Sequence, residues 1–265
     1  MLVSVTGLEL LGAGREAEVF AWDDGRVLRL ARPTARAGMI EREALALAAA
    51  HAAGAQVPAV YEQVVVDGRP GVVIDRIDGV DLLQRLGRRP WTVRPVGKTL
   101  GRQHASLHWV EAPQGLPALR EALRQRLQSE LVPDDVRRVA LERLMGLPDG
   151  DRLLHGDFHP ANLLRTRDGC VVIDWTNGAR GDPSADVARS LLLLGGGDVP
   201  DDAPAVVRRL APFARRLLAT GYLRAYAREL PLDRELVARW LRVWAAARLA
   251  EDIAAERDYL LFQAR

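Results

Sequence analysis

Hydrophobic positions in the first third of the chain alternate over short runs, and turn-forming residues separate these runs. Alternation with a period of two, bounded by Gly and Asp, is typical of β-strands. Asp24–Gly25 and Asp67–Gly68 predict tight hairpin turns, because glycine tolerates the positive φ that such turns require. The predicted strands are Leu8–Leu11, Ala17–Trp22, Arg26–Ala31, Val60–Val66 and Gly71–Ile77.

One stretch of this region has a different pattern. Met39–Ala53 is rich in Ala, Leu and Glu and contains neither Pro nor Gly, which predicts a helix that ends before Gly54. From about Asp81 onward the periodicity is mainly helical. The predicted helices are Val96–His108, Leu116–Glu130, Asp134–Leu144 and a helical remainder from Asp186 that includes one long helix over Arg234–Leu261.

A short β-hairpin interrupts these helices. Its predicted strands, Asn162–Arg165 and Cys170–Trp175, flank the turn Arg167–Gly169. We place a boundary near Gly79, where the strand-rich part of the chain ends. The pattern therefore predicts an α+β, bilobal fold, with a small β-rich lobe over residues 1–79 and a larger, mainly helical lobe over residues 80–265.

Composition narrows the class of protein. Basic and acidic residues are interleaved at a net charge of +2, whereas nucleic-acid binding requires a concentrated basic face, so we expect no nucleic-acid partner. Cys170 is the only cysteine, which excludes an internal disulfide and fits a reducing cytoplasm. Residues 1–14 do not resemble a signal peptide. The longest apolar run, Leu191–Leu194, ends in Gly195–Gly197 and is far shorter than the roughly 20 residues of a membrane span.

Lys98 is the only lysine among 37 basic residues, a bias that codon usage explains. It lies in Gly97-Lys98-Thr99, which superficially resembles a phosphate-binding P-loop. A P-loop needs an earlier glycine, and that position is Thr92. We therefore expect Lys98 on the solvent face of a helix.

The strongest chemical signal is HGDFHPAN, His155–Asn162, followed by Ile173–Trp175. Phosphoryl transfer needs one carboxylate to take the proton of the acceptor hydroxyl, and metal ions to neutralise the phosphate oxygens. Asp157 is the candidate base. Asn162 and Asp174 are candidate ligands of Mg²⁺, which prefers oxygen donors.

Two other interpretations of this segment stay open. His155, Asp157 and His159 have side chains that also bind zinc, as in a metallohydrolase. Alternatively, the polar residues of this segment have only local structural roles in turns and at the surface.

A separate signal is the glycine turn of Leu11–Phe20. Gly12 and Gly14 of this turn either lie over the phosphates of a nucleotide or form a plain hairpin turn.

Together these motifs resemble the aminoglycoside phosphotransferase family, which has a protein-kinase-like fold. HGDFHPANLL followed by VIDWTNGARGDPSADVA is similar to its active-site signature. VVIDRIDGVDLL resembles its interlobe hinge, and GRQHASLH resembles its helix that ends in His. The resemblance implies ATP or GTP as co-substrate and Mg²⁺ as cofactor.

The resemblance also implies roles for single residues. Asp157 would be the base, and Asn162 and Asp174 would bind metal. The backbone of Asp75–Ile77 would contact adenine, with Ile74 behind it. Asp186 would be a structural acid that opens the next helix, consistent with an N-cap role. His155 would orient the loop, and His159 would be either structural or directed toward phosphate.

One position departs from the family pattern. The third strand of the family carries a lysine that pairs with a helix glutamate and touches the nucleotide phosphates, and here Arg29 occupies that place. Arginine keeps the charge but is bulkier and binds in a forked geometry. Its predicted partner is Glu43, in preference to Glu41. Alternatively, Arg29 points to solvent.

The acceptor is expected to be a small molecule. Gly181–Asp186 follows Asp174 so closely that no room remains for the long activation segment on which protein kinases bind peptides. The C-terminal helices leave its class open. Residues 191–265 contain twelve arginines and ten acids, without the acidic excess that would favour a polycation. Aminoglycosides, other antibiotics, sugars, amino alcohols and amino acids all remain candidates.

Two features of these helices have two interpretations each. Four acids close together in the sequence, named below as the acidic cluster, either line an acidic wall of the substrate pocket or lie on a solvated helix face with ion pairs such as Arg248–Asp252. Trp240 and Trp244 either pack in the core or stack on a substrate ring. The acidic cluster consists of Glu251, Asp252, Glu256 and Asp258.

The sequence thus favours a kinase that transfers the γ-phosphoryl group of ATP or GTP to a hydroxyl of a small molecule. The rival hypothesis is a catalytically inactive nucleotide- or ligand-binding protein on the same fold, because Arg29 replaces the usual lysine. The oligomeric state is left open.

Overall fold

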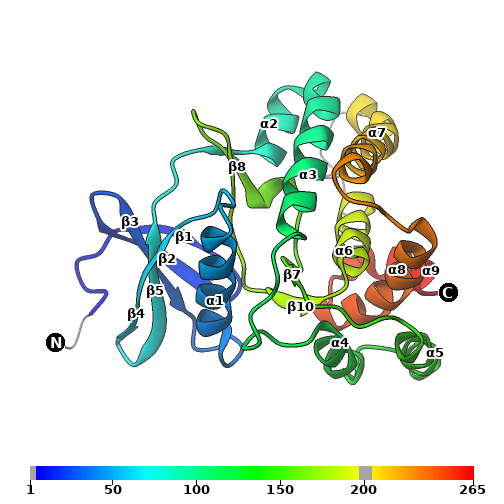
Figure 1. Ribbon diagram of the computed structural model, residues 1–265, viewed down its shortest axis with the longest axis horizontal. Helices are drawn as coiled ribbons and strands as arrows, with labels where there is room; N and C mark the ends of the chain where they lie inside the picture. The colour runs from blue at the N-terminus through cyan, green and yellow to red at the C-terminus, as the bar shows by residue number, and fades with distance from the viewer. Residues whose placement is uncertain (1–3, 197–204) are drawn as a thin grey trace.

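The N-terminal part of the computed structural model is a five-stranded antiparallel sheet with one helix, α1 (Met39–Ala52), packed beside it (Figure 1). The structure describes residues 4–196 and 205–265. The strand order is β1-β2-β3-β5-β4. The strands are β1 (Leu10–Ala13), β2 (Ala17–Asp23), β3 (Arg26–Ala31), β4 (Val60–Val66) and β5 (Arg69–Asp75).

Alternation along β3 separates two packing faces. Leu28 and Leu30 are fully buried and belong to a small apolar cluster with Phe20, Val66 and Val73. Val27 and Ala31 belong instead to the main core, which also contains the buried face of α1. Because successive side chains of a strand point to opposite faces, Arg29 lies on the α1 side of the sheet.

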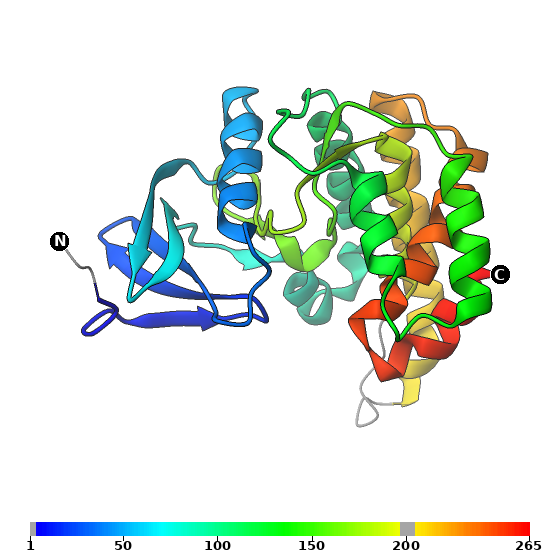
Figure 2. The same cartoon turned by 90° about the horizontal axis from the view of Figure 1, so that it is seen from below.

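The rest of the chain is mainly helical (Figures 1 and 2). The helices are α2 (Leu82–Arg88), α3 (Val93–Leu107), α4 (Leu119–Leu127), α5 (Asp134–Met145), α6 (Pro183–Gly195), α7 (Ala205–Glu229), α8 (Arg234–Arg248) and α9 (Arg257–Ala264), with single 3₁₀ turns η1 (Pro90–Thr92), η2 (Pro160–Asn162), η3 (Leu249–Glu251) and η4 (Ala254–Glu256). Helices α3 and α7 approach closely at Gly101, where a side chain would overlap the Tyr222 carbonyl. No helix among the described residues is long and apolar enough to cross a membrane.

Short strands position the loops between these helices. One small sheet has the order β6 (Val80–Asp81), β8 (Leu163–Arg165), β9 (Cys170–Val172), and a second pairs β7 (Arg152–Leu154) with β10 (Ala179–Gly181). The loop that follows β7 and the loop that follows β9 meet because the Ile173 N–H donates to the Asn162 carbonyl at 2.9 Å. These two loops carry the predicted chemistry.

Most predicted elements are confirmed, with shifted ends. Strand β1 begins and ends two residues later than expected, and Gly12 therefore lies within the strand rather than in the turn. The strand predicted over Cys170–Trp175 ends at Val172, before Asp174. The sequence did not predict α2, β6, β7 or β10. Residues 1–3 of the N-terminal stretch and Gly197 of the apolar run lie outside the described residues.

The prediction of one helix over Arg234–Leu261 is wrong. Helix α8 ends at Arg248, and Asp252 has a left-handed φ of 53°, which Asp tolerates better than most residues. The Arg248 guanidinium forms a two-pronged ion pair with Glu256, at 2.6 and 3.0 Å. In a straight helix these two residues would lie ~12 Å apart along the axis. The break therefore folds the chain back over the end of α8.

Candidate active site

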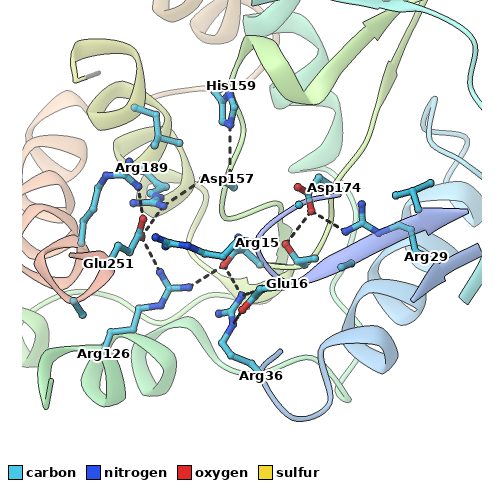
Figure 3. Close-up of a pocket in the computed structure, with 18 residues that line it drawn as sticks. Arg15, Glu16, Arg29, Arg36, Arg126, Asp157, His159, Asp174, Arg189 and Glu251 are labelled. Atoms are coloured by element: carbon cyan, nitrogen blue, oxygen red, sulfur yellow. Dashed lines mark hydrogen bonds and ion pairs between the residues drawn. The ribbon is translucent and has the colours of Figure 1, made fainter. Parts of the chain in front are cut away.

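A cavity of about 550 Å³ lies between the sheet and the helical part of the molecule (Figure 3). Asp157 and Asp174 both line it, together with Gly14 and Arg29 from the sheet side. Further arginines and acids complete its wall. These are Arg15, Glu16, Arg36, Arg126, Arg189, Arg248 and Glu251.

Asp157 lies in the loop that follows β7. The loop turns at Gly156, whose φ of 75° is left-handed and where a side chain would overlap Asn177. Asp157 Oδ1 accepts from Arg189 Nη2 at 3.2 Å, and Oδ2 lies 3.5 Å from His159 Nε2. Burial would raise the pKa of Asp157, but the His159 contact and the Arg189 charge outweigh it and hold the pKa well below its ordinary value. The carboxylate is therefore ionised at neutral pH.

His155 holds the loop from within the core. It is completely buried, its Nδ1 accepts from the Asp157 N–H at 3.2 Å, and its Nε2 lies 3.0 Å from the Ile173 carbonyl. Since both ring nitrogens are engaged, His155 cannot ligate a metal together with Asp157 and His159. His159 has a structural contact and also faces the cavity: its Nδ1 accepts from the Ala161 N–H, and the residue lines the cavity.

Asn162 and Asp174 come together where the two loops meet. Asn162 closes the 3₁₀ turn η2 and donates from Nδ2 to the Asp157 carbonyl at 2.9 Å. Asp174 has a left-handed φ of 62°, an uncommon backbone conformation for a non-glycine residue that is often found at functional sites. The Asp174 carboxylate is about one-third exposed and faces the cavity. An amide oxygen and a carboxylate are hard oxygen donors, so this pair fits a Mg²⁺ ion.

Arg29 bridges the sheet to this site. Its Nε pairs with Glu43 of α1 at 3.0 Å, and its Nη2 donates to Asp174 Oδ1 at 3.2 Å. Glu43 is fully buried, whereas Glu41 is exposed. The structure therefore pairs Arg29 with Glu43 and does not point it to solvent. Burial raises the pKa of Glu43 to about 6 in spite of the Arg29 charge.

The loop backbone before Asp157 is anchored by a buried carboxylate, Asp186 of α6. Its oxygens accept from the backbone N–H groups of His155, at 2.6 Å, and Gly156, at 2.9 Å. The helix N-cap is Asp182, whose side chain accepts from the Ser184 N–H. The expectation that Asp186 caps this helix is therefore wrong, because its carboxylate points away from the helix terminus and into the core.

Two buried histidines, His104 of α3 and His108 directly after it, complete the surroundings of Asp186. Nε2 of His104 and of His108 lies 3.1 and 3.4 Å from Asp186 Oδ2, and their Nδ1 atoms lie 2.7 Å from the hydroxyls of Tyr222 and Tyr226. If each Nε2 donates and each Nδ1 accepts from a tyrosine, every group is satisfied with both rings neutral. Burial, followed by the neighbouring His108 charge, lowers the pKa of His104 to about 4, which agrees with a neutral ring.

These three residues are also the one group of His, Cys, Asp and Glu among residues 4–196 and 205–265 that is close enough to hold a metal. Their N–O distances are those of hydrogen bonds, and two backbone N–H groups already occupy the Asp186 oxygens. We therefore describe the group as a hydrogen-bond network. The predicted zinc alternative of His155, Asp157 and His159 is not among such groups in the described part of the chain.

The predicted nucleotide contacts are only partly gathered at the cavity. Gly14 lines it, whereas Gly12, Ile74, Asp75 and Ile77 do not. The Asp75 N–H donates to the Ala59 carbonyl at 3.2 Å and is not free for an adenine ring. Its carboxylate accepts from the Ala59 N–H and the Tyr61 hydroxyl.

The C-terminal helices resolve two of the open alternatives. Trp240 and Trp244 are buried in the core, so neither is available to stack on a substrate. Asp252 and Asp258 are exposed, and Arg248 pairs with Glu251 and Glu256 rather than with Asp252. Only Glu251 of the acidic cluster lines the cavity. Lys98 is exposed on α3, as predicted.

Sequence reasoning missed the arginines of the helical side. Arg189 lies one turn after Asp186 on α6. This spacing places both residues on one helix face, and it was the signal that could have indicated that Arg189 lies near the active-site loop. Arg126 had no such signal, because its helix carries two other arginines, Arg120 and Arg124, at similar spacing.

Comparisons with known proteins give the family. The model of the phosphotransferase enzyme family matches residues 7–227. A comparison with curated proteins finds no match.

Solved structures of similar fold include an amicoumacin kinase in complex with AMP-PNP, Ca²⁺ and Ami, at 16% identity, a TM-score of 0.65 and coverage of 98% of this chain and 87% of that one. An aminoglycoside-3′-phosphotransferase of type VIII has 21% identity, a TM-score of 0.63 and 93% coverage of both chains. A choline/ethanolamine kinase family protein from Mesorhizobium loti has 19% identity and a TM-score of 0.55, and the match covers 97% of this chain and 85% of that one.

At these identities the neighbours establish the fold, which is the predicted α+β, protein-kinase-like one. The family model covers most of the chain, and the resemblance of its motifs to the aminoglycoside phosphotransferases is thereby confirmed. We conclude that the chain belongs to the phosphotransferase enzyme family.

Proposed function

We propose that this protein is a kinase that transfers the γ-phosphoryl group of ATP or GTP to a hydroxyl group of a small molecule. The observation that carries the proposal is that Asp157 and Asp174 line one cavity, while the buried Asn162, which does not line it, contacts both loops: it donates to the Asp157 carbonyl and accepts from the Ile173 N–H. In the proposal, residues 1–79 bind the nucleotide, and residues 80–265 supply the catalytic loop and the acceptor site. The amicoumacin kinase, solved with AMP-PNP and Ca²⁺, supports a nucleotide-dependent reaction.

Asp157 orients the acceptor hydroxyl and takes its proton. Arg189 occupies Oδ1, whereas Oδ2 has only contacts of 3.5 Å, so Oδ2 is the oxygen open to the hydroxyl. The depressed pKa of Asp157 makes it a weak base. This is compatible with phosphoryl transfer, in which the transition state is loose and positioning contributes more than proton abstraction.

Asn162 and Asp174 would hold Mg²⁺, which when bound neutralises the charge of the phosphate oxygens. Arg29 positions Asp174 by donating to Oδ1, and Thr176 donates to the same oxygen at 2.9 Å. Because both of these donors contact Oδ1, Oδ2 of Asp174 is the oxygen that we assign to the metal ion. Gly12, Gly14, Ile74, Asp75 and Ile77 remain proposed nucleotide contacts, and a cytoplasmic location remains part of the proposal.

The test is the Asp157→Asn variant, assayed for phosphorylation over a panel of hydroxy compounds with ATP or GTP and Mg²⁺. The variant keeps the shape of the side chain but removes the proton acceptor, so we expect kcat to fall by about 10²–10⁴-fold. Asp168→Asn is the matched control, because Asp168 is exposed on the β8–β9 hairpin. Turnover by Asp157→Asn at the wild-type rate would show that Asp157 is not the base.

A second candidate is a nucleotide-binding protein without turnover, and the substitution of arginine for lysine at Arg29 favours it. Arginine can keep a phosphate contact while its bulk changes the position of the phosphates. Calorimetry with Mg²⁺ and nucleotide separates the two candidates when it is combined with an assay of nucleotide hydrolysis. Tight binding without any Asp157-dependent turnover would support the second candidate.

A further inference from the structure

We propose that the phosphoryl acceptor carries an anionic group, a carboxylate or a phosphate, and that Arg126 and Arg189 bind this group beside Asp157. The inference rests on the proposed kinase function, because it names the class of molecule that this site phosphorylates. It concerns the end of the cavity formed by α4, α6 and the segment after α8.

The carboxylates of the cavity wall are already occupied by arginine. A polycationic acceptor would need carboxylates that can accept from its ammonium groups. Instead, each acidic side chain that lines the cavity contacts a guanidinium. The pairs are Glu16–Arg36, Asp157–Arg189, Asp174–Arg29 and Glu251 with Arg126, Arg189 and Arg248.

Three guanidiniums share the Glu251 carboxylate. Oε1 lies 2.9 Å from Arg189 and 3.5 Å from Arg126, and Oε2 lies 2.6 Å from Arg248. Arg248 has a second carboxylate in Glu256, so its charge is balanced. Arg189 also has a second carboxylate, because its Nη2 lies 3.2 Å from Asp157 Oδ1. Arg126 has none among the described residues, where it has only the long contact to Glu251 and a hydrogen bond to Asn177 at 2.9 Å.

Both guanidiniums have donor capacity to spare. A guanidinium carries five N–H donors. Arg189 is almost completely buried, and its Nη1 has no hydrogen-bond partner within residues 4–196 and 205–265, which is costly unless a ligand supplies one. Burial, followed by the charge of Arg189, lowers the pKa of Arg126 to about 10. The two cations therefore repel each other in a partly desolvated place, and an anion between them would relieve this repulsion.

The arginines are also held in position. The Trp244 ring lies 5.1 Å from the Arg189 guanidinium carbon and 5.7 Å from that of Arg126, so both cations lie against one indole. Trp244 itself is fixed, because its Nε1 donates to the Ala185 carbonyl at 2.8 Å. A rigid pair of guanidiniums is suited to an oxyanion, since its two oxygens can accept in parallel.

The position of these arginines argues for the acceptor rather than the nucleotide. In Figure 3, Asp157 lies between Arg126, Arg189 and Glu251 on one side and Asp174 and Arg29 on the other. Asp174, the proposed metal ligand, and its partner Arg29 are on the second side. An anion held by Arg126 would therefore lie across Asp157 from the transferred phosphoryl group, where the acceptor must lie.

The first experiment compares acceptors that share a carbon skeleton and differ in one substituent, which is neutral, cationic or anionic. Glucose, glucosamine, glucuronate and glucose 6-phosphate form one series, and glycerol, 3-amino-1,2-propanediol, glycerate and glycerol 3-phosphate form another. We expect kcat/KM to be at least about tenfold higher for an anionic member than for the neutral and cationic members of its series, because only an anion forms charge-assisted hydrogen bonds with the two guanidiniums. The carboxylate and phosphate members distinguish the two kinds of oxyanion. A preference for the cationic or neutral members would overturn the proposal.

The second experiment measures binding without turnover, so that it does not depend on the kinase reaction. Glucuronate, glucosamine and inorganic phosphate are titrated calorimetrically into protein loaded with AMP-PNP and Mg²⁺. We expect Arg126→Gln to weaken binding of the anions by about 10–100-fold. Arg124→Gln is the matched control, because Arg124 lies on the exposed face of the same helix and pairs with Glu121.

The outcomes separate the two proposals. Arg126-dependent binding of anions without turnover would support the anion site and would count against the kinase function. Turnover of neutral or cationic acceptors that Arg126→Gln does not change would support the kinase and refute the anion site. If Arg126→Gln instead weakens AMP-PNP binding, Arg126 belongs to the nucleotide site and the anion proposal is wrong.

Discussion

Two carboxylates of this molecule stand at the centre of polar clusters, and their surroundings are opposite in kind. Asp186 is completely buried and is contacted by neutral donors, namely two histidine rings and two backbone N–H groups. Glu251 is partly exposed and is contacted by three guanidiniums. In the first cluster donors and acceptors are matched. In the second, donors are left over.

The difference indicates what each cluster does. A matched buried network fixes one conformation, because any change leaves a polar group unsatisfied. Asp186 accordingly holds the backbone of His155 and Gly156, which sets the place of Asp157. A cluster with surplus donors is incomplete without a ligand.

The Asp186→Asn variant should lose most of the stability that the matched network provides. An amide has one acceptor oxygen and places an N–H₂ group among N–H donors, so several donors become unsatisfied. We expect the free energy of unfolding to fall by about 3–5 kcal/mol, as measured by urea denaturation. Asp182→Asn is the control, because asparagine caps a helix as well as aspartate does. Equal stability of the two variants would mean that Asp186 is not the anchor of the loop.

Acid should weaken the same network through His104. Its pKa is lowered from 6.5 to about 4 in the folded protein, chiefly by burial. Between these two values the unfolded chain takes up a proton that the folded protein excludes, so stability is full above pH 6.5 and is lost as the pH falls toward 4. Such a lowering corresponds to roughly 3 kcal/mol.

The check is the unfolding free energy as a function of pH for the wild type and for His104→Gln. The variant should be less stable at pH 8, yet lose less stability between pH 6.5 and 4. Glu43 has the opposite effect, because its raised pKa makes the folded protein bind a proton more tightly below pH 6. Since Glu43 is present in both proteins, it cancels in the difference. Parallel pH curves would show that His104 does not titrate in this way.

The smallest effect is expected at the second cluster. Glu251→Gln removes the carboxylate that three arginines share, and because the side chain is partly exposed we expect a loss of only about 1–2 kcal/mol of stability. Inorganic phosphate should then raise the denaturation midpoint more for the variant than for the wild type. If phosphate stabilises both equally, the guanidiniums have no surplus donors to satisfy.

The sequence predicted the parts of the molecule that local rules govern. Asp67–Gly68 forms the expected turn with both residues at positive φ, and β3 and β4 have the predicted bounds. The spacing of Asp157, Asn162 and Asp174 on two loops joined by a hairpin was enough to expect them together. Glu43 was preferred over Glu41 from its local context, and the structure pairs it with Arg29.

What the sequence did not predict depends on packing between distant segments. Arg126 and Arg189 meet Glu251 because the chain breaks after α8, and no Pro or Gly marks that break. The helical pattern runs through it, while an ion pair between Arg248 and Glu256 and the left-handed Asp252 decide the path. The network around Asp186 of α6 likewise joins the loop after β7, the end of α3 and α7, which only the folded arrangement brings together.

The close crossing of α3 and α7 has a consequence for how a newly made chain becomes active. Tyr222 and Tyr226 supply the hydroxyls of the histidine network, and they follow the active-site loop by more than sixty residues along the chain. While the ribosome is still making this part, the histidines lack those partners and the loop lacks its firm support. We therefore expect the catalytic loop to acquire its final form late in synthesis, after α7 has docked at Gly101, so that incomplete chains do not transfer phosphate.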